Sequence, residues 1–458
     1  MEETRSVKGQ LWKVIQLSVP AVLAEITAIA MQYIDAAMVG SLGAGASAAI
    51  GLVSSTTWLF GGLCIAAATG FSVQVAQLIG AGREKDAKGA LRQALICTLA
   101  FGLFLSAVGI GISQGLPVWL GGEADVCVDA SRYFLIYACM LPATQIRQMA
   151  GSMLQCSGNM GVPSRLNIMM CALDVVFNSL LIFPSRQVTV LGLSIWMPGA
   201  GLGVMGAALG TAFAEAVTAA LMLCAVCFGA GPLKLKRHGS WKPDGGCIKL
   251  AARLALPMAL EHVILCGAQI AGTRIVAPLG TVSVAANSLA VTAESLCYMP
   301  GYGIAAAATT LVGQSIGAGK RGDAKRYAAL SVALGAAVMS CTGALMFFGA
   351  PFMFSLLTPD ASIRELGARV LRIEAFAEPL FAVSIVAAGA LRGAGDTLIP
   401  SVMNLASMWG VRITASLILA PRFGLVGVWT AMCAELCVRG VMFFIRLARG
   451  KWLDRKVV

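Results

Sequence analysis

The sequence predicts an all-α, multi-pass membrane protein with twelve transmembrane helices arranged as two six-helix lobes. Three observations carry this prediction: the composition, the number of long apolar runs and an internal repeat. Hydrophobic residues make up 58% of the 458 residues and charged residues only 12%, and the mean hydropathy is +0.81. A soluble chain carries about 25% charged residues. The composition therefore excludes a soluble globular protein.

Twelve apolar runs are long enough to span a membrane, since about 20 apolar residues suffice to cross a bilayer. Their approximate limits are 12–37, 44–71, 88–114, 131–155, 163–183, 201–229, 250–276, 283–312, 326–349, 368–391, 400–420 and 424–447. Most of the 34 lysines and arginines lie near the two ends of the chain and in the even-numbered loops. The positive-inside rule then places both termini in the cytoplasm, with the chain in the inner (plasma) membrane. Because topology explains the net charge of +12, no nucleic-acid partner is expected.

An internal repeat divides the chain into two similar halves. The segment Gln77-Leu-Ile-Gly-Ala-Gly82 returns as Gln314-Ser-Ile-Gly-Ala-Gly319, at an offset of 237 in the sequence numbering. The offset falls to 221 after a longer fifth loop in the first half. Because each copy holds an even number of spans, the copies enter the membrane in the same sense, with a substrate path expected between them. We expect an N-lobe at 1–233, a cytoplasmic linker at 234–249 and a C-lobe at 250–458.

The first apolar run carries two carboxylates, Glu25 and Asp35. A charge at membrane depth costs about 3 kcal/mol even on lenient scales, so such residues face a wet cavity or a partner. Glu25, Gln32 and Asp35 lie within about 100° of one another around an α-helix. This stripe is therefore expected to line a cavity.

Eight carboxylates are placed at membrane depth, and the two halves differ in the number of cationic side chains that could pair with them. They are Glu25, Asp35, Asp174 and Glu215 in the first half and Glu261, Glu294, Glu378 and Glu435 in the second. The first half offers only Arg147 as a cationic partner, whereas the second offers up to three arginines and His262. A buried acid without a cation favours its protonated form. The first half is therefore the better candidate for a proton switch.

Each candidate also has a purely structural interpretation. For Asp35 and Asp174 a functional role is favoured, because no residue in the sequence obviously neutralises their charge. Glu25, Glu261 and Glu294 suit either a functional role or hydrogen bonds between helices. For Glu215, Glu378, Arg412 and Glu435, structural ion pairing is the favoured interpretation. Met31 and Met170 are candidates for the soft walls of a substrate cavity.

Three segments carry a family resemblance that extends over essentially the whole chain. They are Ile34-Asp-Ala-Ala-Met-Val-Gly40, the two Gly-Ala-Gly repeats, and Leu391-Arg-Gly-Ala-Gly-Asp-Thr397. In these segments the chain resembles the multidrug and toxic compound extrusion (MATE) transporters. The resemblance implies a V-shaped pair of six-helix lobes that exports amphipathic, often cationic compounds, driven by inward movement of protons or sodium.

The resemblance also assigns individual residues. Asp35 matches the family's first-helix coupling aspartate, Asp174 matches a fifth-helix aspartate of the DinF-like branch, and Thr211 matches a sixth-helix threonine of the same network. The sodium-linked NorM-like branch has a glutamate and an aspartate where this chain has Leu265 and Phe381. These departures favour the DinF-like branch and proton coupling.

Two positions leave the coupling ion open. Glu261 lies one turn from Leu265 and is the candidate for a C-lobe cation site. Met31 and Met170 stand where some relatives have tyrosine and asparagine one turn before the two aspartates, so the N-lobe network also departs from the family pattern.

The predicted function is a secondary antiporter that exports hydrophobic, often cationic small molecules against protons, within the lipid bilayer. No nucleotide-binding loop, His-rich metal cluster or Ser–His pair is present in the sequence, so neither an enzyme nor a cofactor is expected. The alternatives are a sodium-coupled antiporter, a flippase for lipid-linked oligosaccharides and a passive channel. A flippase should have a cationic cavity to hold diphosphate, whereas acids outnumber bases here.

Overall fold

The computed structural model describes residues 6–190, 193–229, 231–235, 240–454 and 457. The first half contains α1 (Val7–Gly40), α2 (Ala44–Gly80), α3 (Glu84–Ile112), α4 (Leu116–Trp119), α5 (Ala124–Cys156), α6 (Gly161–Leu181), β1 (Pro184–Val190), β2 (Leu193–Ala200) and α7 (Gly203–Phe228). The second contains α8 (Gly245–Val276), η2 (Ala277–Leu279), α9 (Thr281–Gly317), α10 (Arg321–Leu357), α11 (Ala361–Ala375), α12 (Glu378–Gly393), α13 (Leu398–Ser407), η3 (Met408–Ile413), α14 (Thr414–Ala448) and η4 (Lys451–Asp454).

The helical membrane fold expected from the sequence is confirmed. Within the described residues, 9 helical segments are long and apolar enough to cross a membrane. The segment Leu398–Ala448 is 51 residues long and turns at Gly424, whose φ is +59°. This kink separates the predicted runs 400–420 and 424–447. The run 368–391 is split instead, because α11 ends at Ala375 and α12 starts with a proline in its first turn.

One hairpin departs from the expected all-helical chain. Strands β1 and β2 pair antiparallel in the fifth loop, with Arg186 opposite Met197. This loop is the segment whose extra length changes the repeat offset from 237 to 221. The repeat predicts the extra length of the loop, but not its strands.

The expected linker, 234–249, includes residues 236–239, which lie outside the described residues. Helix α8 begins within the expected linker, at Gly245. Asp244 caps it, since its Oδ1 accepts from the backbone N–H groups of Gly246 at 2.9 Å and Cys247 at 3.4 Å.

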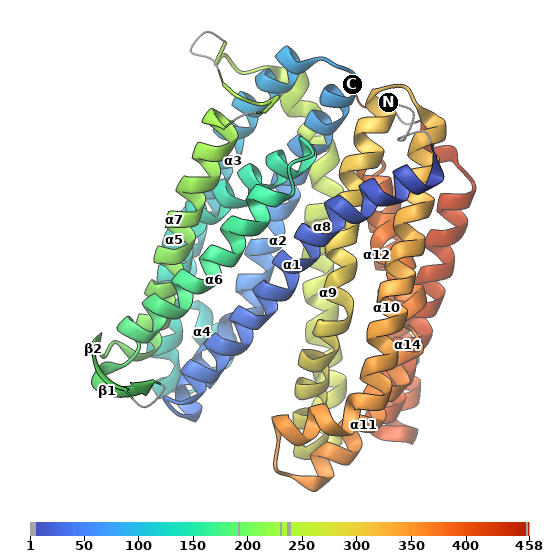
Figure 1. Ribbon diagram of the computed structural model, residues 1–458. Helices are drawn as coiled ribbons and strands as arrows, with labels where there is room; N and C mark the ends of the chain where they lie inside the picture. The colour runs from blue at the N-terminus through green and yellow to red at the C-terminus, as the bar shows by residue number, and fades with distance from the viewer. Residues whose placement is uncertain (1–5, 191–192, 230, 236–239, 455–456, 458) are drawn as a thin grey trace.

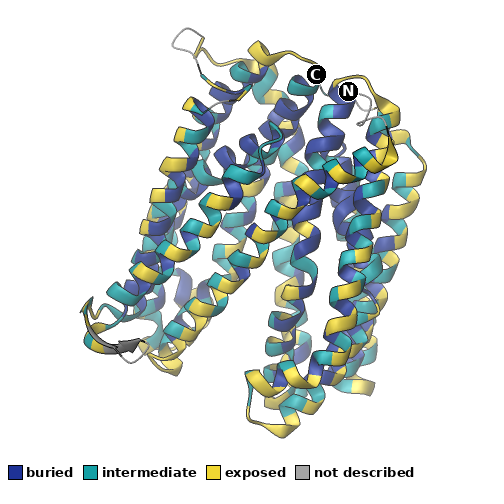
Figure 2. Cartoon of the chain, in the orientation of Figure 1, coloured by how far each residue is buried: buried dark blue, intermediate teal, exposed yellow. Residues whose placement is uncertain are grey.

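The two lobes, α1–α7 and α8–α14, meet at the end that carries both termini and diverge toward the end that carries the hairpin and α11 (Figure 1). The first helix of each lobe packs on the second helix of the other, α1 on α9 and α8 on α2. Glycine permits the close approach: a Cβ on Gly303 would lie 2.6 Å from the backbone nitrogen of Val22. Buried side chains concentrate inside the lobes and exposed ones on their outer faces (Figure 2).

The repeated glycine motif joins the lobes at the end that carries the termini. A Cβ on Gly80 would collide with the carbonyl oxygen of Gln314, and one on Gly317 with that of Gln77. Each glutamine side chain also reaches the opposite lobe. The Nε2 of Gln77 donates to Gly393 O at 3.3 Å, and that of Gln314 donates to Cys156 O at 2.9 Å. The two acceptors are related by the same offset of 237, so the repeat is symmetric at the level of contacts.

Farther along α1, Tyr33 links the lobes through a hydrogen bond to the backbone of α9. Its Oη donates to the carbonyl oxygen of Thr292 on α9 at 2.8 Å. We expect Tyr33→Phe to lower the free energy of unfolding by about 1 kcal/mol, because one intramolecular hydrogen bond is lost. Thermal unfolding in detergent measures the change. Tyr302→Phe is the control, since that side chain is 45% exposed; an equal loss in both variants would contradict the account.

Candidate functional site

In the N-lobe, the predicted coupling residues Asp35 and Asp174 are held together by an amide. The Nδ2 of Asn178 donates to Asp35 Oδ1 at 2.9 Å and to Asp174 Oδ2 at 3.0 Å. The two carboxyl groups also lie within hydrogen-bonding range of one another, and Thr211 contacts Asp174. Asp174 and Asn178 are fully buried. Residues from α1, α6 and α7 therefore form one acidic site, in which Asp35 is half-buried.

Local sequence explains this geometry. Asp174 and Asn178 are four residues apart on α6, so they share a helical face. Gly210 on α7 leaves the space for the asparagine, because a Cβ there would collide with Asn178 Oδ1. Asn178 is not among the site residues predicted from the sequence. Its spacing from Asp174 is the one signal in the sequence that indicates its role.

Two acceptors in the acidic site lack a donor. In the described part of the chain, Asp174 Oδ1 and Asn178 Oδ1 are buried without a hydrogen-bond partner. Buried polar atoms are generally paired, and a carboxyl group becomes a donor only when it is protonated. No cation lies within 4 Å of either aspartate among the described residues, where Arg147 instead pairs with Glu215 at 2.6 Å. The arrangement is thus suited to hold a proton.

The predicted cavity residues of the N-lobe differ in exposure. Glu25 and Met31 are half-buried, Gln32 is exposed and Met170 is buried. The charge of Arg147 acts on Glu25 although the two do not form an ion pair.

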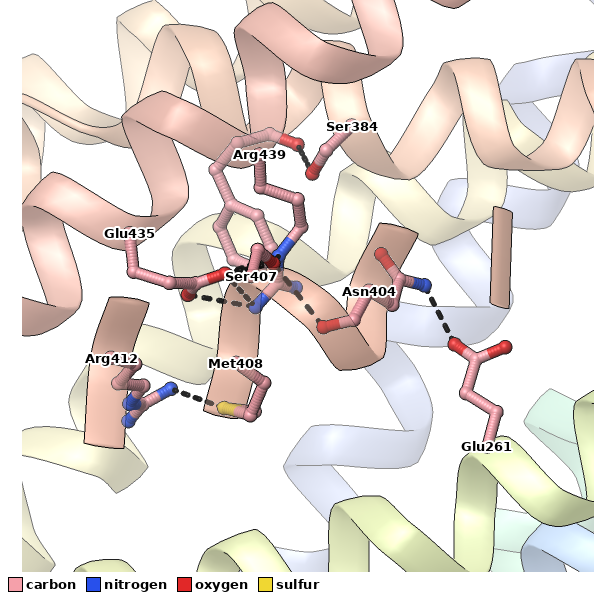
Figure 3. A network of polar contacts seen from close by, with 9 residues as sticks. Glu261, Ser384, Asn404, Ser407, Met408, Arg412, Glu435 and Arg439 are labelled. Carbon is pink, nitrogen blue, oxygen red and sulfur yellow. Dashed lines mark hydrogen bonds and ion pairs between the residues drawn. The ribbon is translucent and has the colours of Figure 1, made fainter. Parts of the chain in front are cut away.

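Glu261 belongs to a separate network in the C-lobe (Figure 3). Its carboxylate accepts from Ser401 Oγ and Asn404 Nδ2, both at 2.6 Å, and pairs with Arg392 at 3.5 Å. Nearby, Glu435 pairs with Arg439 at 2.7 Å and accepts from Ser407 Oγ at 2.6 Å (Figure 3). Both of these carboxylates therefore have an arginine as a partner, whereas the N-lobe pair has none among the described residues.

Glu294 lies in a second buried acidic group, together with Glu374 and Glu378. Glu294 is 7% exposed and the other two are fully buried. Within the described ranges, the side-chain oxygens of Glu374 and Glu378 have no hydrogen-bond partner. The ion pairing favoured for Glu378 from the sequence is not found among the described ion pairs. Glu374 is not among the predicted residues, although it stands only four residues before Glu378.

Comparisons with known proteins identify the family. The MatE family model matches twice, at residues 20–180 and 257–418, and the starts of the two matches are related by the repeat offset of 237. A protein of Thermotoga maritima named "Probable multidrug resistance protein NorM" is 24% identical over 459 residues, covering 100% of this chain and 96% of the relative. A protein of the same name from Deinococcus radiodurans is 28% identical, with coverage of 96% and 95%. These names give no support to the expected DinF-like branch.

Solved structures show the same fold. A MOP superfamily transporter from Pyrococcus furiosus superposes with a TM-score of 0.88 at 18% identity, covering 98% of this chain and 97% of that one. A MATE transporter from Vibrio cholerae gives 0.87 at 15% identity, with coverage of 97% and 98%. Because the family matches occupy well over half of the sequence, the chain belongs to the MatE family and is a multi-pass membrane transporter rather than an enzyme.

Proposed function

We propose that this transporter is a secondary antiporter that exports amphipathic, often cationic small molecules in exchange for protons. The observation that carries the proposal is the pair of carboxyl groups, Asp35 and Asp174, that share the amide of Asn178 and have no cation beside them among the described residues. The names of the relatives, which refer to multidrug resistance, support the substrate class. Topology supports an inner-membrane location with both termini in the cytoplasm.

Protons and a cationic substrate would compete for the same negative charge. When Asp35 loses its proton, the charge attracts a cation or demands water; when the proton returns, that attraction ends. An ion biases a two-state transporter only if the two states bind it differently. The site lies between α6 and α7 of the N-lobe and α1, which also packs on α9 of the C-lobe, so a change in its charge acts on a helix that contacts both lobes.

We assign the coupling role to Asp35, Asp174, Asn178 and Thr211. Glu261 remains the candidate for sodium coupling, but its three partners already compensate its charge. The proposed substrate cavity contains Glu25, Met31, Gln32, Met170 and Glu294. The proposed lobes are 1–233 and 250–458, joined by 234–249.

Efflux from liposomes tests the proposal. Purified protein is reconstituted with a fluorescent cationic dye inside, and an imposed pH gradient is compared with an imposed sodium gradient. We expect dye export to follow the pH gradient alone. Export driven by sodium would move the coupling site to Glu261, and no dye movement under either gradient would reject the antiporter.

A further inference from the structure

The C-lobe contains a cavity between α8, α9, η3 and α14. Its lining includes Gln269, Gly272, Arg412, Ser416, Trp429 and Met432. Gln269 and Thr273 on α8 are exposed, so the cavity is open on that side.

This cavity is the symmetry counterpart of the acidic site in the N-lobe. The repeat offset of 237 relates residues of α1 to residues of α8, and the offset of 221 relates residues of α7 to residues of α14. Three cavity residues follow from these offsets: Gln269 corresponds to Gln32, Gly272 to Asp35, and Met432 to Thr211. The aspartate of the first helix is therefore replaced by a glycine.

The second aspartate is replaced by an arginine. Ser164 on α6 and Ser401 on α13 are both buried and are related by the offset of 237. The π-helix η3 follows, and a π turn holds one residue more than an α turn. When that extra residue is added to the offset of 237, Asn178 corresponds to the buried Ser416 and Asp174 corresponds to Arg412. The two lobes thus place opposite charges at equivalent positions.

The guanidinium of Arg412 is not engaged by any carboxylate of the described residues. Its one hydrogen-bond contact in that part of the chain is the sulfur of Met408 at 4.0 Å (Figure 3). By contrast, Arg147, Arg392 and Arg439 each pair with a glutamate within 4.0 Å. Glu294 and Glu374 feel the charge of Arg412 but do not form an ion pair with it.

We propose that this cavity binds the carboxylate of an amphipathic substrate, with Arg412 as the group that holds it. A guanidinium is planar and matches a carboxylate with two parallel hydrogen bonds. Trp429, Met408 and Met432 supply apolar walls. The indole is fixed in place, because Trp429 Nε1 donates to Asn287 Oδ1 at 2.9 Å. This inference rests on the proposed export of amphipathic compounds.

A matched pair of dyes tests the inference by equilibrium binding. The first is a rhodamine with a free benzoate group, and the second is its methyl ester, which lacks the negative charge. Fluorescence anisotropy with detergent-solubilised protein gives the affinity for each. We expect Arg412→Gln to weaken binding of the free-acid dye by about 10-fold or more, the effect of losing hydrogen bonds between charged groups. Binding of the ester should change less than about 2-fold.

Two further variants separate recognition from structural support. Arg412→Lys keeps the charge and should restore part of the affinity for the free acid. Arg274→Gln removes an exposed arginine from α8, one of the helices around the cavity, and should affect neither dye. An equal loss for both dyes in Arg412→Gln, or an unchanged affinity for the free acid, would overturn the inference. Displacement of the free-acid dye by millimolar chloride or phosphate would reassign the site to a small inorganic anion and would equally overturn it. Because binding is measured without a gradient, these outcomes are independent of the efflux test.

Discussion

Substitution of either aspartate, as Asp35→Asn or Asp174→Asn, is expected to reduce gradient-driven dye export to the level of empty liposomes. Asparagine keeps the size of the side chain and a hydrogen-bonding amide but cannot gain or lose a proton. A proton that no longer binds differently to the two states cannot shift their equilibrium, however steep the gradient. The measurement is the initial rate of efflux under an imposed pH gradient, normalised to the amount of reconstituted protein.

Asp125→Asn is the control for this prediction. Asp125 is an exposed acid in the first turn of α5, outside the acidic site. Its substitution should leave the export rate unchanged. Full export by Asp174→Asn, or an equal loss in the control, would remove the acidic site from the coupling mechanism.

The second large effect is expected where the repeated motif joins the lobes. Gly80→Ala and Gly317→Ala each place a methyl group against the backbone carbonyl of the opposite lobe. A backbone carbonyl cannot rotate away as a side chain can, so the helices α2 and α9 must separate. Overpacking of this kind costs about 3 kcal/mol. We expect a marked loss of thermal stability in detergent for both variants.

Gly89→Ala provides the matched control. A Cβ on Gly89 meets nothing within 4 Å, and the residue lies in the helix α3. Alanine there should raise stability by up to about 1 kcal/mol, because alanine favours helix more than glycine does. Similar behaviour of all three variants would show that the close contact between the lobes is not essential for stability.

Much of the fold could be predicted from the sequence, because membrane-spanning helices can be identified from their apolar composition. Apolar runs and the repeated Gly-Ala-Gly motif predict the helices, the two lobes and their related order without any knowledge of packing. Helix boundaries were less predictable. Helix α12 starts with a proline in its first turn, and the last helix turns at Gly424. Neither break changes the hydropathy of the sequence, so the apolar runs do not show where these helices end.

The acidic site could be predicted only in part. Asp35 and Asp174 stand out because charge is rare at membrane depth, whereas Asn178 is a neutral residue whose importance depends on the space that Gly210 leaves for it. The relation between Asp174 and Arg412 was hidden for another reason. The π-helix η3 shifts the repeat by one residue, so the two positions do not align at a constant offset.

The most direct test of proton exchange is to measure protons released when a cationic substrate binds. Detergent-solubilised protein is placed in weakly buffered solution with a pH-indicator dye, and tetraphenylphosphonium is added. We predict that the native chain releases about one proton for each cation that it binds. By linkage, a cation that binds better to the deprotonated site lowers the affinity of that site for its proton. Asp35→Asn should release none. Binding without proton release by the native chain, or unchanged release by Asp35→Asn, would contradict proton exchange at this site.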